Sequence, residues 1–245
     1  MNGAGLQDRL HRARLLLGDE VMTSLAEKRV ILFGVGGVGS WCAEALVRSG
    51  VKHLTVVDFD TVCPSNVNRQ MMATTRTIGQ VKVEALRERL LEINPDAEIE
   101  AVRETFSAGN AGTFNLGRYD YIIDAIDSLK DKAQLILSAC ETDATLLSSM
   151  GAALKTDPTR VAVAEFWKVR GCPLGAALRR MFRKSGRMPA KKFQCVYSEE
   201  LQRNCLPSEG EAANGSLMHI TAIFGCTLAG LLIQSEIKIE RCKSL

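Results

Sequence analysis

The glycine run GVGGVG at residues 34–39 constrains the fold of this chain more than any other feature. It follows an apolar segment that predicts a strand and opens a segment that predicts a helix. The spacing fits G-x-G-x-x-G, in which Gly34 permits the tight turn, Gly36 lets a phosphate approach and Gly39 allows close packing of helix on strand. Amides at the start of a helix favour an anionic phosphate. The candidate nucleotide-binding glycines are Gly34, Gly36, Gly37 and Gly39.

Strands and helices alternate from residue 29 to residue 150, which predicts an α/β fold with a doubly wound, mostly parallel, Rossmann-like sheet. The predicted strands cover residues 29–34, 53–57, 98–102, 119–123 and 144–148. The predicted helices between them cover residues 38–49, 79–94, 107–115 and 130–142. We expect one domain over residues 1–245, made of N-terminal helices in 1–28 broken near Gly18, a nucleotide-binding core in 29–150 and an extension in 151–245. The extension should contain strands at 161–169 and 193–198, a basic segment at 168–192 and an apolar helix at 217–233.

The bulk composition is ordinary for a soluble globular protein, with 46% hydrophobic and 24% charged residues. The first twenty residues show no apolar region typical of a secretory signal, so we expect a cytoplasmic protein. The apolar run 217–233 has the minimum length for a bilayer span, but it contains polar residues such as His219 and Thr221. We therefore predict a core helix and no stable membrane insertion.

Eight cysteines are present, and no two of them form a C-x-x-C pair. Structural zinc sites usually show such pairs, so we expect no zinc. In a reducing compartment most of these thiols should behave as small buried hydrophobes. A single catalytic thiol among them stays open as an alternative.

The segment DFDTVCPSNVNRQ, residues 58–70, carries both an acid and a cation. Asp58 ends the second predicted strand, where a carboxylate holds ribose hydroxyls. Arg69 has no evident use in hydride transfer, whereas splitting a triphosphate builds negative charge that cations must neutralise. Lys82, in the predicted helix 79–94, is the natural second cation, although alone it would pass for a solvated charge. Together they favour a nucleoside triphosphate over NAD.

A metal ion should accompany these cations. Asp127 lies just past the fourth predicted strand, at the carboxyl edge where open α/β sheets bind ligands. Mg²⁺ prefers one or two carboxylates together with phosphate oxygens. Asp124 is the alternative ligand, but it can instead serve to turn the end of the strand.

Four segments, GVGGVGSW, DFDTVCPSNVNRQ, GQVKVE and DAIDS, resemble the ThiF/MoeB/HesA superfamily of adenylate-forming enzymes related to ubiquitin-activating enzyme. The resemblance covers residues 9 to about 165. It implies an ATP site in which Asp58 holds the ribose and Asp127 binds Mg²⁺. It also implies that Arg12 enters the ATP site of a neighbouring subunit, and hence a homodimer. The implied catalytic residues are Arg12, Arg69, Lys82 and Asp127, and the implied ATP site also includes Asp60 and Asn66.

Four stretches resemble one branch of this superfamily, the tRNA threonylcarbamoyladenosine dehydratases or TcdA/CsdL group. They are GVGGVGSWCAEALVRSGV, IIDAIDSLKDKAQLI, SSMGAALKTDPTRVAVAEFWKVRGCPL and CVYSEE. This resemblance implies adenylation of the carboxylate of threonylcarbamoyladenosine at position 37 of tRNA. An internal nucleophile would then displace AMP and close a ring with net loss of water. The chain is shorter between Pro207 and Ser216 than the enterobacterial members.

The segment 168–192 holds nine cations and no acid in a chain whose net charge is only +3. Such local asymmetry is typical of a surface that contacts a phosphate backbone. A solvated basic loop is the alternative. We expect tRNA and not DNA as the partner, and the candidate RNA-binding residues are Arg179, Arg180, Arg183 and Lys184.

Three other functions stay open. The chain could adenylate the C-terminal glycine of a ubiquitin-like sulfur carrier, although the missing C-x-x-C pairs and the basic segment disfavour this. It could be a non-catalytic nucleotide-binding partner of a cysteine desulfurase or sulfur-acceptor system, but a scaffold has no need of Arg69, Lys82 and Asp127. An NAD dehydrogenase is the weakest alternative, because it leaves Arg69 and Lys82 unexplained.

Overall fold

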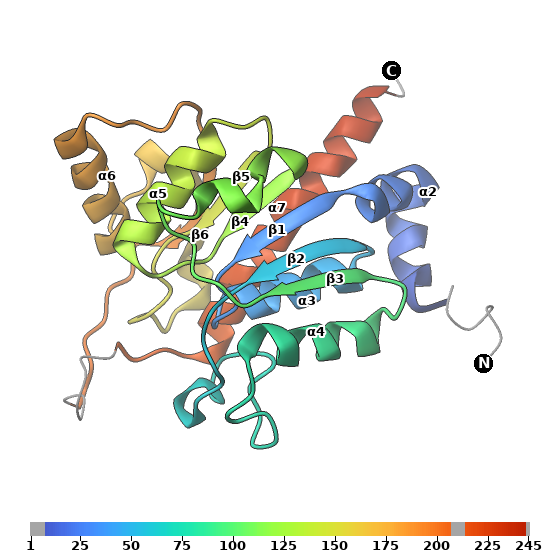
Figure 1. The fold of residues 1–245 in the computed structure, drawn as a ribbon, viewed down its shortest axis with the longest axis horizontal. Coiled ribbons are helices and arrows are strands. Elements are labelled where there is room, and N and C mark those ends of the chain that lie inside the picture. The colour runs from blue at the N-terminus through green and yellow to red at the C-terminus, as the bar shows by residue number, and fades with distance from the viewer. Residues whose placement is uncertain (1–7, 207–213, 244–245) are drawn as a thin grey trace.

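The computed structural model describes residues 8–206 and 214–243. Its centre is a seven-stranded sheet in the order β3-β2-β1-β4-β5-β7-β6 (Figure 1). Neighbouring strands are parallel except β6, which is antiparallel to β7. The strands are β1 (Arg29–Phe33), β2 (His53–Val57), β3 (Glu98–Val102), β4 (Tyr121–Asp124), β5 (Thr145–Ser149), β6 (Val161–Glu165) and β7 (Gln194–Ser198). The predicted α/β fold with a mostly parallel sheet is confirmed.

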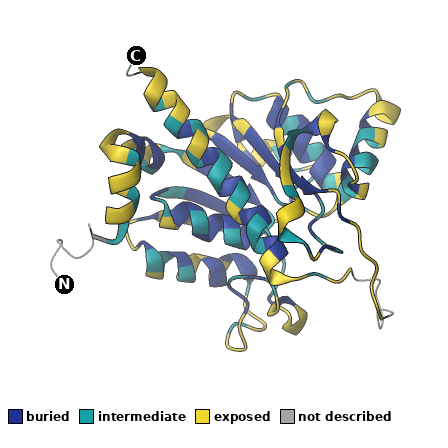
Figure 2. Ribbon diagram, turned by 180° about the vertical axis from the view of Figure 1, so that it is seen from behind, coloured by how far each residue is buried: buried dark blue, intermediate teal, exposed yellow. Residues whose placement is uncertain are grey.

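Helices cover both faces of the sheet. One face carries α3 (Gly39–Arg48), α4 (Lys82–Ile93) and α7 (Met218–Lys243), and the other carries α5 (Leu129–Cys140) and α6 (Pro173–Ser185) (Figures 1 and 2). Strand β1 explains why both faces need a cover of helices. Val30 and Leu32 belong to the apolar core on one face, and Ile31 and Phe33 belong to the core on the other. A parallel strand that is buried on both faces reads as such a continuous apolar run.

The N-terminal helix α2 (His11–Glu27) packs on α7 beside the amino ends of the strands (Figure 1). This helix is kinked at Gly18, where φ is 81°. The kink agrees with the break that the sequence predicts near this residue. Short 3₁₀ turns lie at η1 (Asp8–Leu10), η2 (Pro64–Asn66) and η5 (Pro158–Arg160).

The glycine turn between β1 and α3 has no room for side chains at two positions. A Cβ atom on Gly34, whose φ is 85°, would lie 2.7 Å from the carbonyl oxygen of Ala125. A Cβ atom on Gly39 would lie 1.8 Å from the carbonyl oxygen of Gly34. Real Cβ atoms do not come this close to backbone atoms, so glycine is required at both positions, as the motif predicts.

Helix α7 is docked into the protein along its length. A Cβ atom on Gly225 would lie 2.4 Å from the carbonyl oxygen of Val38, so α7 and α3 meet at backbone distance. Further along, the buried carboxylate of Glu236 accepts hydrogen bonds from Tyr121 at 2.5 Å and from Ser24 at 2.6 Å. By length and composition α7 could cross a membrane, but 44% of its most apolar window is buried inside the protein. These contacts make α7 part of the core.

The predicted helix at 107–115 is wrong. The structure has two 3₁₀ turns instead, η3 (Ala111–Phe114) and η4 (Leu116–Arg118), separated by Asn115 at a φ of 44°. The side chain of Asn110 explains the difference, because it accepts a hydrogen bond from the Ser107 amide and donates one to the Thr105 carbonyl. Such local bonds compete with the helix for backbone groups.

Two boundaries and one helix in the C-terminal extension also differ from expectation. Strand β6 ends at Glu165, whose carboxylate accepts the Trp167 amide at 3.1 Å and caps the 3₁₀ turn η6 (Phe166–Lys168). The basic segment contains a helix, α6, which starts at Pro173 and is ended by Gly186 at a φ of 70°. These are ordinary helix start and stop signals. Helix α7 continues to Lys243 instead of ending near residue 233, and most of the short loop between Pro207 and Ser216 lies outside the described residues.

The close contact at Gly225 predicts a change in stability. We expect Gly225→Ala to lower the free energy of unfolding by about 1–3 kcal/mol, because the added methyl group forces α7 away from α3. Gly230→Ala is the matched control, since no atom lies within 4 Å of a Cβ there. The control should raise the stability by up to about 1 kcal/mol through helix propensity. Urea unfolding followed by circular dichroism measures both, and equal effects would contradict this account of the helix packing.

Candidate functional site

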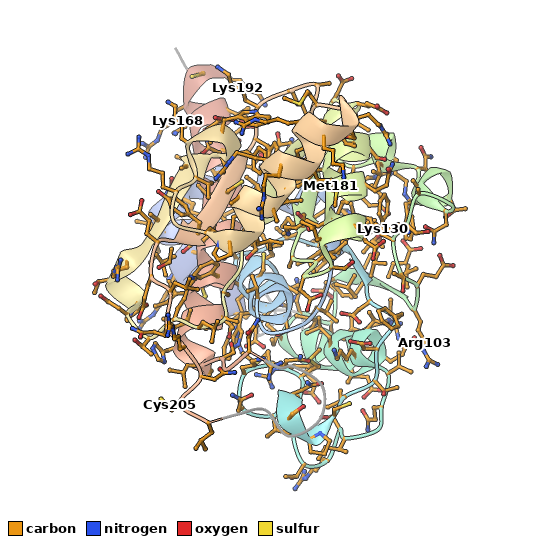
Figure 3. The ribbon with its side chains drawn as sticks, turned by 90° about the vertical axis from the view of Figure 1, so that its left-hand side faces the viewer. Arg103, Lys130, Lys168, Met181, Lys192 and Cys205 are labelled. Carbon is orange, nitrogen blue, oxygen red and sulfur yellow. The ribbon has the colours of Figure 1, made fainter. Side chains whose placement is uncertain are left out.

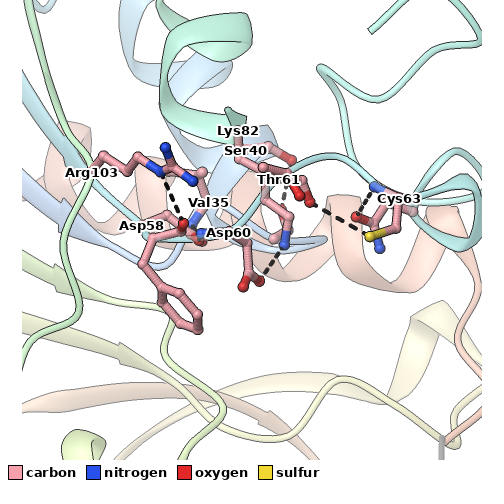
Figure 4. Close-up of polar contacts among 11 residues, drawn as sticks. Val35, Ser40, Asp58, Asp60, Thr61, Cys63, Lys82 and Arg103 are labelled. Atoms are coloured by element: carbon pink, nitrogen blue, oxygen red, sulfur yellow. Dashed lines mark hydrogen bonds and ion pairs between the residues drawn. The ribbon is translucent and has the colours of Figure 1, made fainter. Parts of the chain in front are cut away.

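The carboxyl ends of β1, β2 and β4 meet at the glycine turn, and Asp58 fixes the geometry there. One carboxylate oxygen of Asp58 accepts the Val35 amide at 2.8 Å, and the other accepts the Asp60 amide at 2.9 Å (Figure 4). Asp58 therefore ties the glycine turn to the loop that follows β2. Its carboxylate is held in place at the edge where a ribose is expected.

Lys82 is the first residue of α4 and is 6% exposed. Its Nζ donates to Asp60 Oδ2 at 2.7 Å, and the Asp60 side chain is 44% exposed (Figure 4). The solvated-charge alternative for Lys82 is therefore excluded. A buried ammonium group with one half-exposed partner can bind an incoming phosphate, because the anion can replace the carboxylate at the open side.

Arg69 lies against the glycine turn. Its Nη1 donates to the Ser65 carbonyl at 2.7 Å and to the Asn68 side chain at 3.0 Å. The Arg69 carbonyl accepts the indole N–H of Trp41 at 3.0 Å, and a Cβ atom on Gly37 would lie 3.4 Å from Arg69 Cγ. The guanidinium stem is thus fixed beside the first turn of α3.

Asn66 is buried in the same loop. Its Oδ1 accepts the Cys63 amide at 3.0 Å, so the oxygen is used to shape the loop. The Nδ2 group of Asn66 is the part that can donate to a ligand.

The two aspartates at the end of β4 and just after it have different surroundings. Asp124 is fully buried, forms an ion pair with the Lys132 ammonium at 2.8 Å and accepts a hydrogen bond from Ser148 at 2.6 Å. Its carboxylate is occupied by the protein itself, so Asp124 is structural. Asp127 is exposed at the end of the same strand. One exposed carboxylate fits a Mg²⁺ ion that takes its other ligands from phosphate oxygens and water.

Gln70 is a further candidate site residue that no sequence pattern indicated. It is 6% exposed, and its Oε1 has no hydrogen-bond partner among the described residues. A Cβ atom on Gly36 would lie 3.7 Å from Gln70 Nε2, so the amide group faces the glycine turn. A buried polar group without a partner is costly. The sequence carries no local signal for this position, because the glycine that Gln70 faces is distant in the chain.

The segments SSMGAALKTDPTRVAVAEFWKVRGCPL and CVYSEE meet at the carboxyl edge of the sheet. The Glu200 carboxylate accepts hydrogen bonds from the amides of Thr156 and Asp157, both at 2.9 Å. The hydrogen bond from Gln202, with those from Asp157 and Thr156, lowers the pKa of Glu200 to about 2. This clamp joins the segment after β5 to the segment after β7.

Arg12 is exposed on α2, at the other end of the sheet (Figure 1). The preceding Arg9 side chain donates to Asn94 at 2.7 Å and pairs with Asp96, and both partners precede the amino end of β3. Leu16, which is 83% exposed, lies on the same helix. Arg12 is therefore far from the glycine turn of its own chain.

The cations of the basic segment fall into two groups. Arg179 donates to the Phe166 carbonyl at 3.3 Å, and Lys191 donates to the carbonyls of Thr142 and Ala144, so both have structural contacts. Exposed cations on or beside α6 form the second group, which comprises Lys168, Arg170, Arg180, Arg183, Lys184, Arg187 and Lys192. Lys168 and Lys192 lie around α6 at the opposite end of the view from Cys205 (Figure 3).

Several of the cysteines are buried in the core. Burial raises the pKa of Cys195 well above its ordinary value, and it also raises the pKa of Cys140. Among residues 8–206 and 214–243, no three His, Cys, Asp or Glu side chains gather as a metal-binding group. The expectation that the protein needs no zinc stays a prediction.

Two hollows of about 640 and 690 Å³ lie elsewhere, lined by residues such as His53, Glu98 and Arg118 in one case and Lys52 and Asn94 in the other. They border the amino ends of β2 and β3. Nucleotides bind open α/β sheets at the carboxyl edge, so neither hollow is the candidate site.

Comparisons with known proteins agree with this geometry. The ThiF family model matches residues 9–243. The tRNA threonylcarbamoyladenosine dehydratase of Bacillus subtilis is 34% identical over 96% of this chain and 94% of its own length. The crystal structure of Escherichia coli tRNA N6-threonylcarbamoyladenosine dehydratase, TcdA, in complex with AMP superimposes with a TM-score of 0.88 at 31% identity and covers 98% of both chains. The molybdopterin-synthase adenylyltransferase of Escherichia coli is 33% identical over only 55% of this chain. The chain belongs to the ThiF family and, within it, to the group of the tRNA threonylcarbamoyladenosine dehydratases.

Proposed function

We propose that this protein is a cytoplasmic, ATP-dependent enzyme that adenylates the carboxylate of threonylcarbamoyladenosine at position 37 of tRNA and promotes its cyclisation with loss of water. The observation that carries the proposal is the cluster at the carboxyl edge of the sheet. Asp58 and Arg69 contact the glycine turn, and the buried Lys82 pairs with Asp60 in the loop that Asp58 ties to that turn. The likeness over nearly the whole chain to relatives of that name supports the same substrate. Solved structures of one such relative contain AMP and ATP.

Each residue has a physical task in this reaction. Asp58 holds the ribose, and the amides at the start of α3 bind the phosphates. Lys82 exchanges Asp60 for a phosphate oxygen, and Arg69 supplies the second cation as negative charge develops at the α-phosphorus. Asp127 would hold Mg²⁺, which contributes further positive charge when bound. The substrate carboxylate displaces pyrophosphate, and the internal nucleophile then displaces AMP.

The proposal includes a homodimer. Arg12 is exposed at the amino edge of the sheet, whereas the nucleotide site is at the carboxyl edge. Arg12 can take part in the reaction only in the site of a second copy. The exposed Leu15 and Leu16 beside it, 73% and 83% exposed, are apolar surface that such a copy would cover.

The assignment of the cation and the metal ligand can be tested by substitution. We expect Arg69→Ala and Asp127→Ala to fold normally and to reduce AMP formation on the order of a hundredfold. Each removes charge stabilisation worth about 3 kcal/mol in the transition state. The matched controls are Arg76→Ala and Asp143→Ala, which change exposed residues that have no task in the proposed reaction. AMP release is measured with ATP and modified tRNA, and turnover of either site variant close to that of its control would show that the site is wrongly assigned.

A mixing experiment tests catalysis across the dimer. We expect Arg12→Ala and Asp127→Ala each to be inactive, but their mixture to recover roughly a quarter of the activity. Half of the dimers would be hybrids with one intact site of two. Mixing Arg69→Ala with Asp127→Ala is the control and should recover nothing, because both residues serve the same subunit's site. Equal recovery in both mixtures, or a fully active monomer, would remove Arg12 from catalysis.

A further inference from the structure

The surface beside α6 carries an exposed aromatic ring among its cations. We propose that Trp167 is a stacking platform for an unpaired base of the RNA substrate, with the surrounding cations holding the flanking phosphates. This inference rests on the proposed function and deepens it, because it assigns recognition of a single-stranded loop to a particular side chain.

The ring of Trp167 stands on a rigid support. Its neighbour Phe166 is fully buried, stacks on Phe193 at 5.0 Å and contacts Phe182 at 5.8 Å. The Trp167 ring meets Phe166 edge to face at 5.1 Å, and its backbone amide is held by Glu165. A platform that is already ordered loses little conformational entropy when a base stacks on it.

The surroundings of Trp167 favour a polyanion. Trp167 is 36% exposed, and Lys168 and Arg170 follow it on the surface. The guanidinium of Arg183 lies 5.8 Å from the centre of the Trp167 ring. This distance is at the outer limit of a cation–π contact. A base that stacks closely can displace Arg183, which then meets the adjacent phosphate.

An aromatic ring next to cations distinguishes between kinds of RNA. A base-paired stem offers this surface only phosphates, because its bases stack on one another. The unpaired bases of a loop can turn outward and stack on aromatic rings or on guanidinium planes. The substrate nucleoside at position 37 lies in such a loop, the anticodon loop, so its neighbouring bases are the partners that fit. The alternative is that Trp167 only fills the space between β6 and α6.

Fluorescence separates these cases, because the chain has only two tryptophans. The other one, Trp41, bonds the Arg69 carbonyl in the nucleotide site, so Trp41→Phe leaves Trp167 as the only reporter. We expect an anticodon stem–loop RNA to quench this emission in a saturable way. A blunt duplex of equal charge should bind in a filter assay without quenching.

Variants supply the second readout. Trp167→Ala should weaken stem–loop binding about tenfold or more and leave duplex binding unchanged, since stacking of one base has about this value. Trp167→Phe should keep most of the affinity. Met188→Ala, which truncates another exposed apolar side chain on this surface, is the matched control and should change neither. Circular dichroism and ATP binding check that each variant is folded.

The outcomes distinguish the inference from the proposed function. Stem–loop binding that is independent of Trp167, with no quenching, would overturn the platform and leave the tRNA-modifying activity in place. Equal quenching by the duplex would overturn it as well. If neither RNA binds and modified tRNA is not converted, the proposed function fails and the platform with it.

Discussion

The whole site depends on close backbone packing around the start of α3. At three glycine positions this packing leaves no room for a side chain. Gly39 lies against the carbonyl of Gly34, and Gly34 against that of Ala125, at distances that exclude a Cβ atom. Gly225 of α7 meets the carbonyl of Val38 in the same way. Four elements, β1, β4, α3 and α7, therefore meet within one turn. The backbone amides at the start of α3 are therefore fixed at the carboxyl edge of the sheet, where they can donate hydrogen bonds to a phosphate.

Two lysine–aspartate ion pairs near this turn differ in their roles. One is structural, and the other is proposed to bind phosphate. Lys132 and Asp124 are both fully buried, and removal of either would leave an unpaired charge in the interior. That pair fixes the end of β4 and so presents Asp127 at the edge. In the second pair Asp60 is 44% exposed, which leaves Lys82 open to an incoming anion. The difference in exposure explains why one pair is structural and the other is proposed to act on phosphate.

Local patterns predicted those parts of the fold that depend on near neighbours. The apolar runs placed the strands, because a strand buried on both faces is apolar throughout. The glycine spacing placed the turn, because short-range sterics exclude side chains there. The 3₁₀ turns at 111–118 were mispredicted because the Asn110 side chain competes for the backbone. Glu236 and Gln70 could not be assigned from the sequence, since their surroundings come from residues or backbone distant in the chain. Helix α6 was missed although its Pro and Gly signals were present, because the charge of the segment dominated its interpretation.

The most direct test of the central claim uses purified protein, ATP and tRNA that either carries or lacks threonylcarbamoyladenosine. Nucleosides from the tRNA are analysed by mass spectrometry, and AMP is measured in the same reaction. The account predicts that the modified nucleoside loses one water and that AMP forms in equal amount, whereas the unmodified tRNA yields neither product. An unchanged nucleoside, with AMP formed only when a ubiquitin-like carrier is supplied, would contradict it.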